Sequence, residues 1–137
     1  MTTPADLHTA LLARLRTAPA ITVYEGTVPP SPPAGADGRV YPYAVIWPGG
    51  GGALGETSLD ARAHGTDWRA QVTVVAGDLT WCLQAIALVR AAAVGVYLAT
   101  DTTPVVDDTP PSMTLLRDPD VTPTRWYLPV LLRCTAA

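Results

Sequence analysis

The chain has 137 residues, 48% of them hydrophobic, and a formal net charge of −3 at pH 7. This length and apolar content predict one globular domain with its own core and exclude wholesale disorder. The negative charge and the scattered arginines disfavour a general nucleic-acid-binding protein, and no long apolar run is present to span a membrane.

The first predicted element is an amphipathic helix over residues 4–17. Thr3 can cap its start, Pro4 suits the first helical position, and Asp6 stands three residues after the cap. Apolar residues recur at helical spacing on one face, which we expect to be buried. They are Leu7, Leu11, Leu12 and Leu15. Pro19 ends the helix.

Three strands are predicted next, at residues 21–24, 40–47 and 67–77. The segment 25–39 contains two proline pairs, which allow neither a helix nor a strand ladder. Residues 48–66 are predicted as a second loop. Along 67–77 apolar and polar residues alternate, so one face of this strand is expected to be buried. The residues on that face are Trp68, Ala70, Val72, Val74 and Ala76.

A second helix is predicted over residues 79–94. Asp78 or Thr80 can cap its start, and Gly95 ends it. We expect the apolar residues at helical spacing to face inward. They are Leu79, Cys82, Leu83, Ile86, Val89 and Ala93.

Three further strands are predicted at residues 96–100, 112–118 and 124–134. In the last of these, Pro129 points outward and cannot donate a ladder hydrogen bond, so it requires a bulge or an edge position. The order of the elements, with two helices and short connections between strands, predicts an α+β fold. We expect a mixed or antiparallel sheet packed against two helices in a single domain, residues 1–137.

One stretch, residues 42–55, raises the question of a nucleotide site. It reads PYAVIWPGGGGALG, a β-forming run followed by four glycines. Gly50, Gly52 and Gly55 have the G-x-G-x-x-G spacing of a dinucleotide-binding loop. However, the chain has no Lys for a P-loop, and the residues that follow predict only a weak helix, interrupted by Gly65. A mobile loop is favoured, because glycine loses more backbone entropy on ordering than any other residue.

Side chains capable of catalysis or metal binding form no recognisable motif. His8 and His64 have no spaced partner, so exposed histidines are expected rather than metal ligands. Asp107–Asp108 and Asp118–Asp120 could act as acid and base, but both pairs lie in Pro/Thr-rich turns, where aspartate bonds its own backbone. Cys82 falls on an apolar helix face, which is typical of inert packing. We therefore predict no enzyme activity and no catalytic, cofactor-binding or metal-binding residues.

Three groups of motifs, taken with the order of the elements, are similar to those of one protein family. They are VYEG and YPYAVIW around the proline-rich loop, DWRAQVTVVAG followed by a helix with AIALVRAAA, and the later stretch LLRDPDVTPTRWYLPVLLRC. In these features the chain resembles the tail terminator, or tail completion, proteins of long-tailed bacteriophages, especially siphophages. Lys, Asn and Phe are absent, which indicates a GC-rich genome and suits a phage of a GC-rich host.

The resemblance implies a homo-hexameric ring that caps the head-proximal end of the tail tube. Such a ring ends tube polymerisation and forms the joining surface to the head and neck. Its implied partners are further copies of itself, the major tail tube protein and a head–tail connector or neck protein. Genomic DNA passes through the channel without specific binding, and neither a membrane nor a cofactor is involved. The implied location is the virion tail or neck, and the host cytoplasm during assembly.

Two other functions stay open on the sequence. The first is a neck or head-closure adaptor, which is also a structural virion protein. The second belongs to another class: a small nucleotide- or ligand-binding enzyme that uses the Gly49–Gly52 loop. Mass in solution and a nucleotide-binding assay would distinguish the structural functions from the enzyme.

Under the terminator interpretation, residues 49–66 are expected to be a recognition arm that becomes ordered against a neighbouring subunit or the tube. Leu54 and Leu59 would be its apolar anchors. The interface candidates are Gly49, Gly50, Gly51, Gly52, Leu54, Glu56, Leu59 and Arg62.

Acidic residues are expected to line the channel of the ring. A surface without Lys and with net negative charge avoids binding the phosphates of DNA. The candidates are Glu56, Asp60, Asp107, Asp108, Asp118 and Asp120. The arginines are then expected at subunit contacts, where a planar guanidinium pairs with carboxylates of the next copy.

Overall fold

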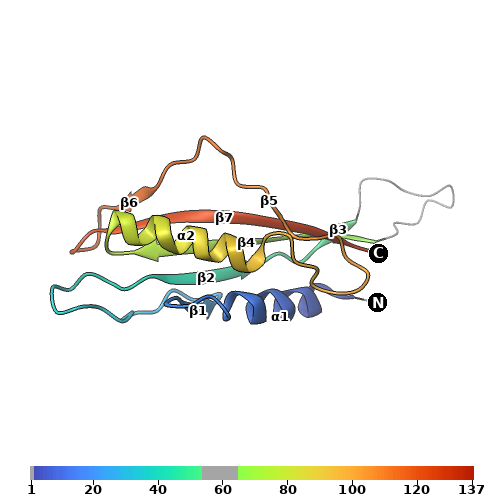
Figure 1. The fold of residues 1–137 in the computed structure, drawn as a ribbon, viewed down its shortest axis with the longest axis horizontal. Helices are drawn as coiled ribbons and strands as arrows, with labels where there is room; N and C mark the ends of the chain where they lie inside the picture. Colours follow the sequence, from blue (N-terminus) through green and yellow to red (C-terminus); the bar gives the residue numbers. More distant parts are fainter. Residues whose placement is uncertain (1, 54–64) are drawn as a thin grey trace.

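A computed structural model of the chain describes residues 2–53 and 65–137 (Figure 1). Seven strands form one mixed sheet, and two helices accompany it, which is the α+β fold expected from the sequence. In chain order the elements are α1 (Pro4–Leu15), β1 (Thr22–Glu25), β2 (Tyr43–Pro48), β3 (Gly52–Ala53), β4 (Thr66–Ala76), α2 (Leu79–Ala93), β5 (Val106–Asp107), β6 (Leu116–Asp118) and β7 (Arg125–Ala136).

The sheet is built around the two longest strands, β4 and β7. Its order is β1-β2-β4-β7-β5, with β3 also paired to β4 and β6 also paired to β7. The β4–β7 pair is antiparallel and runs from Thr66↔Ala136 to Ala76↔Trp126. The only parallel pair within the described strands is β1–β2, because the connection over residues 26–42 is long enough to carry the chain back to the same end.

Both helices begin at side-chain caps. At α1 the Thr3 backbone N–H donates to Asp6 Oδ2 (2.8 Å), and the Asp6 N–H donates to Thr3 Oγ1 (3.2 Å). At α2 the cap is Asp78, whose Oδ1 accepts the N–H groups of Thr80 (2.9 Å) and Trp81 (3.2 Å). Each cap satisfies backbone donors that have no partner inside the helix. The α1 helix starts where the sequence predicted and ends at Leu15, two residues earlier.

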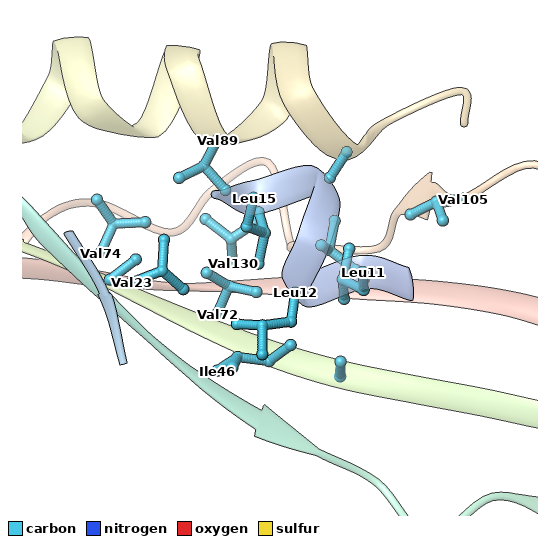
Figure 2. Close-up of a cluster of buried hydrophobic side chains, with 14 of the residues drawn as sticks. Leu11, Leu12, Leu15, Val23, Ile46, Val72, Val74, Val89, Val105 and Val130 are labelled. Atoms are coloured by element: carbon cyan, nitrogen blue, oxygen red, sulfur yellow. The ribbon is translucent and has the colours of Figure 1, made fainter. Parts of the chain in front are cut away.

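The main core lies between the two helices and one face of the sheet (Figure 2). Leu11 and Leu15 of α1 are fully buried against the sheet valines Val72 and Val130, and Val89 of α2 is buried beside them. The alternation predicted for β4 is confirmed, since every second residue from Trp68 to Ala76 is buried. The same alternation runs along β7 from Leu128. Burial of these side chains is the dominant favourable term in folding.

The predicted inward face of α2 is partly wrong. Cys82, Ile86, Val89 and Ala93 are buried as expected, but Leu79 and Leu83 are 44% and 53% exposed. Alanines take their place in the interior, namely Ala85 and Ala92. Apolar residues occur on all sides of α2, so its periodicity does not define a single buried stripe.

The strand predicted at residues 96–100 is also wrong. This segment forms turns, with one isolated bridge between Tyr97 and Pro104. The strand in this region is β5, where the sequence predicted a loop. The Gly95 N–H donates to Val105 O (2.8 Å) and the Val105 N–H donates to Val96 O (2.9 Å), so the chain folds back directly after α2. Strand β6 covers only the last three residues of the predicted strand 112–118.

Pro129 occupies an edge position, which is one of the two settings, bulge or edge, that the sequence allowed. On the side away from β4, strand β7 pairs with β6 through residues 125–127 and with β5 through Leu132 and Arg133. Pro129 lies between these two stretches. Its missing N–H therefore removes no ladder hydrogen bond.

Candidate functional site

The glycine stretch after β2 is held by backbone and side-chain hydrogen bonds. The Gly49 N–H donates to Arg69 O (2.8 Å), and Gly49 O accepts the indole N–H of Trp68 (2.9 Å). Gly52 and Ala53 form β3, which pairs with the start of β4. The loop predicted from residue 48 is therefore wrong for Gly49, Gly52 and Ala53, which are hydrogen-bonded to or paired with β4, while Gly50 and Gly51 lie between them outside any strand.

Two of the glycines are required by close contacts. A Cβ atom on Gly49 would lie 2.5 Å from Arg69 O. Gly51 has a φ of +77°, and a Cβ there would lie 2.8 Å from Thr66 Cγ2. A Cβ on Gly50 would meet nothing within 4 Å. Packing within the chain thus accounts for Gly49 and Gly51 without any ligand.

Replacing Gly49 with Ala is expected to lower the free energy of unfolding by about 1–3 kcal/mol. The new Cβ would collide with a backbone carbonyl that cannot move without breaking the β2–β4 pairing. The matched control is Gly50→Ala, where the space is open and a small gain from the less flexible unfolded chain is expected. Urea unfolding of both variants is the measurement, and equal losses would contradict this geometry.

The dinucleotide pattern does not have its required setting in the described part of this stretch. The fingerprint needs its glycines to open a helix, so that backbone N–H groups face a pyrophosphate. Gly52 instead belongs to β3 and pairs with Asp67 of β4. The third glycine of the pattern, Gly55, lies outside the described residues.

The predicted interface residues are only partly described. Gly50, Gly51 and Gly52 are exposed and Gly49 is half-buried. The other candidates lie outside the described residues, as does the lumen candidate Asp60. These other interface candidates are Leu54, Glu56, Leu59 and Arg62.

The described lumen candidates lie at two separate ends of β7. Asp107 is opposite Leu132 and Asp118 is opposite Arg125, so seven residues, or about 23 Å, separate them along the strand. Asp120 donates its N–H to Asp118 Oδ1 (3.0 Å), which is the turn hydrogen bond expected for this pair. The structure therefore places these carboxylates in two groups.

Asp107 is already committed to a partner within the chain. Its Oδ2 lies 2.6 Å from Arg90 Nε, and its Oδ1 accepts the Thr109 N–H (2.9 Å). Partial burial acts to raise the pKa of Asp107, but the hydrogen bonds from Thr109 and Arg90 outweigh it, so this pKa lies below its usual value. Asp108 is more open, with its carboxylate 3.7 Å from the Arg69 guanidinium.

The side chains considered for catalysis have structural partners. His8 is mostly buried, contrary to expectation, and its Nε2 lies 2.9 Å from Glu25 Oε2. Cys82 and Cys134 are buried and form no disulfide, and burial raises the pKa of Cys82 to about 11. A thiol with this pKa is almost entirely protonated near neutral pH and is a poor nucleophile. Within residues 2–53 and 65–137, no three His, Cys, Asp or Glu side chains gather where they could hold a metal ion.

The sheet face opposite the helices carries a second apolar cluster. Tyr43, Val45 and Val75 are buried there together with Val40. Tyr24 packs edge-on against Tyr43, with ring centroids 5.9 Å apart. A groove of about 330 Å³ runs over this face, and its lining includes Val28, Trp47 and Tyr127. The continuous apolar run in β2 is the sequence signal for this cluster, because a strand with two apolar faces is covered on both.

We define the helix-free face by the exposed or half-buried residues Val28, Trp47 and Tyr127 together with the buried cluster beneath them. Trp47 is 37% exposed and Val28 is 53% exposed. No described helix covers this side of the sheet, since both pack into the main core. Exposed apolar surface of this kind is typical of protein–protein contacts.

A further groove, of about 800 Å³, lies between α2 and the segment 108–115. Leu79, Leu83 and Met113 contribute to its walls, and the Arg90–Asp107 ion pair stands in its lining. Neither described helix is long and apolar enough to span a membrane. Because Leu79 and Leu83 are 44% and 53% exposed, this side of α2 is a second apolar surface suited to contact with a protein.

Comparison with models of known protein families finds none that matches this sequence, and comparison with curated proteins finds no match either.

The fold class is a mixed seven-stranded sheet with two helices. Its most distinctive surfaces are the helix-free face and the exposed side of α2. Both surfaces expose large apolar side chains.

Proposed function

We propose that this chain is a phage tail terminator: a ring-forming protein that caps the head-proximal end of the tail tube. The ring ends tube polymerisation and offers the joining surface to the head or neck. The observation that carries the proposal is the helix-free face, with Trp47 and Val28 exposed beside a buried aromatic cluster. Exposing such an apolar face to water costs free energy, and covering it with another protein is favourable.

A closed ring needs two different surfaces on each subunit, because each copy contacts its neighbours through unlike patches. The helix-free face and the exposed side of α2 lie on opposite sides of the sheet, and each carries large apolar side chains. This separation supports assembly into a ring or stack rather than a simple two-fold dimer. The order of the elements and the three groups of sequence motifs resemble those of tail terminator proteins, which favours a ring of that kind.

The charge of the chain suits a channel for DNA. The chain has no Lys, and several of the described arginines are paired with a carboxylate, as Arg39 is with Asp78 and Arg90 is with Asp107. Paired guanidinium groups bind DNA phosphates less readily than a free basic cluster. Among the described channel candidates, Asp108 and Asp120 are exposed.

The proposal is tested by polymerising the tube protein of the same phage with and without this chain. We expect shorter tubes that carry sixfold rings at one end, measured as length distributions by negative-stain microscopy. Trp47→Glu, which puts a charge on the helix-free face, is expected to abolish the shortening. Ala13→Glu, on the exposed side of α1, is the matched control and should cap normally.

Unchanged tube lengths would contradict the terminator function. If the chain then binds a purified connector protein, it acts as a head-closure adaptor instead. Saturable binding of a nucleotide in calorimetry, lost in Gly50→Val, would favour the enzyme alternative.

A further inference from the structure

The turn at residues 35–39 contains the one Asp-Gly sequence of the chain, Asp37–Gly38. An aspartate followed by glycine is particularly prone to spontaneous succinimide formation, because glycine has no Cβ to hinder the approach of its own amide nitrogen. The Asp37 side chain is 52% exposed, so water reaches this turn. The pair is therefore a candidate site of slow covalent change.

Succinimide formation would join the side chain of Asp37 to the main chain. The Gly38 nitrogen attacks Cγ of the protonated carboxyl group, an N–Cγ bond forms, and water leaves with the carboxyl hydroxyl and the amide proton. Water then opens the ring at one of its two carbonyls. Attack at Cγ restores aspartate, whereas attack at the main-chain carbonyl leaves isoaspartate, in which the backbone runs through Cβ and Cγ. One water is released and one is taken up, so no other reactant is needed.

Arg39 holds the Asp37 carboxyl group in its less reactive form. The Arg39 backbone N–H donates to Asp37 Oδ1 (3.1 Å), and Arg39 Nε donates to Oδ2 (2.6 Å). These two hydrogen bonds, the backbone one first, hold the pKa of Asp37 below its usual value. An ionised carboxylate is a poor electrophile, because it carries negative charge and has no hydroxyl group to lose.

The attacking nitrogen is also engaged in the folded turn. The Gly38 N–H donates to Gly35 O (3.0 Å), and the Gly35 N–H donates to Arg39 O (3.0 Å), which closes the turn. Attack requires the Gly38 nitrogen to lose its proton and move toward Cγ, so its bond to Gly35 must break first. Gly38 has a φ of +81°, which other residues adopt only with strain. The turn therefore needs the same glycine that makes the sequence reactive.

Arg39 is fixed beside Asp37 by contacts with α2. Its Nη1 donates to Oδ2 of Asp78, the N-cap of α2 (3.1 Å), and its guanidinium carbon lies 4.8 Å from the centroid of the Trp81 ring. Isoaspartate at residue 37 would add a methylene group to the main chain and displace the carboxylate from Arg39. The modification would therefore alter the turn that carries Arg39 to α2.

We propose that Asp37–Gly38 is a site of spontaneous isoaspartate formation and that its turn, with Arg39, suppresses the reaction in the folded chain. The reactive state is the opened turn, in which the Gly38–Gly35 hydrogen bond is broken and Arg39 has left the carboxylate. The proposal does not rest on the tail terminator function, because it uses only contacts within one chain.

The proposal is tested by oxygen exchange at residue 37 in H₂¹⁸O. Each passage through the succinimide adds one heavy oxygen atom to this residue, whichever carbonyl the water attacks, and peptide mass spectrometry locates it. We expect exchange to be about tenfold slower in the folded chain than in the same chain unfolded in urea, because several hydrogen bonds must open first. Asp37→Glu should abolish the exchange, because the larger ring that glutamate would form closes far more slowly.

Arg39→Met separates the effect of the guanidinium from that of the rest of the turn. It removes the Nε bond to Asp37 and keeps an apolar stem near Trp81, and exchange in the folded variant should rise about threefold, as expected for an exposed ion pair. Arg69→Met is the matched control, because Arg69 is also paired with the aspartate two residues before it, Asp67 (3.3 Å). It should leave exchange at residue 37 unchanged, with circular dichroism confirming the fold of both variants.

Three outcomes would overturn the proposal. An absence of exchange in the unfolded chain would show that Asp37–Gly38 is no modification site. Equal rates in the folded and unfolded chains would exclude protection by the turn. A rate in Arg39→Met no higher than in Arg69→Met would exclude the role of the Arg39 guanidinium.

Discussion

Replacing Trp68 with Ala is expected to lower the free energy of unfolding by about 3–5 kcal/mol. Trp68 is 1% exposed in the main core, so the substitution leaves a large cavity. It also removes the indole N–H that donates to Gly49 O (2.9 Å). Urea unfolding followed by far-ultraviolet circular dichroism measures the change and does not depend on tryptophan fluorescence.

Trp47→Ala is the matched control, because Trp47 lies on the helix-free face with 37% of its surface exposed. We expect it to change the stability of the free chain by less than about 1 kcal/mol. Trp68→Phe should fall between the two, because it keeps most of the apolar volume but loses the donor. A Trp47→Ala loss as large as that of Trp68→Ala would show that the helix-free face belongs to the core.

The second large effect is expected from Leu11→Ala, which should cost about 2–5 kcal/mol. Leu11 is fully buried between α1 and the sheet (Figure 2). The same substitution at Leu83, which is 53% exposed on α2, should change stability by less than about 0.5 kcal/mol. Both sites are helical and Ala is a strong helix former, so differences in helix propensity do not account for the contrast. Thermal and urea unfolding of both variants provide the comparison.

A reversed order of these two losses would contradict the observed orientation of α2. If Leu83→Ala is neutral in the free chain, it becomes a useful probe of assembly, since any effect on tube capping then reports a contact with another protein. The buried Leu11 cannot serve this purpose, because its substitution would weaken the fold itself.

The elements with strong local signals were predicted well from the sequence. Thr3, Pro4 and Asp6 make a capping box with a proline at the first helical position, and α1 starts there. Alternation along residues 67–77 predicted β4 and its buried face, and the strand predicted at 124–134 is β7, Arg125–Ala136. These signals are local because a cap or a period depends only on residues that are neighbours along the chain.

The elements that were predicted wrongly depend instead on contacts between residues that are distant along the chain. The segment 96–100 is rich in β-forming residues, but the hydrogen bonds of Gly95 and Val105 turn the chain back before it can pair as a strand. The exposed side of α2 could not be deduced from its periodicity, because apolar residues surround the helix. The face that packs was selected by α1 and the sheet, which come from elsewhere in the chain.

The candidate surfaces were the least predictable part. The glycines suggested mobility, yet Gly49 is held by Arg69 and Trp68, some twenty residues later. Trp81 of α2 contacts Arg39 and Tyr41, which come from the proline-rich connection between β1 and β2. No local pattern in the sequence indicates that Trp81 and Tyr41 are neighbours.

The sequence by itself determined the α+β class, the start of each helix, the two long central strands and the need of Pro129 for a bulge or an edge position. Hydrogen bonds of caps, the pleat of strands and the missing donor of proline are properties of short segments. Only the tertiary structure decided the parallel β1–β2 pair, the exposed side of α2 and the packing of the glycines. These depend on contacts between distant segments, where shape and burial over the whole sheet override local preference.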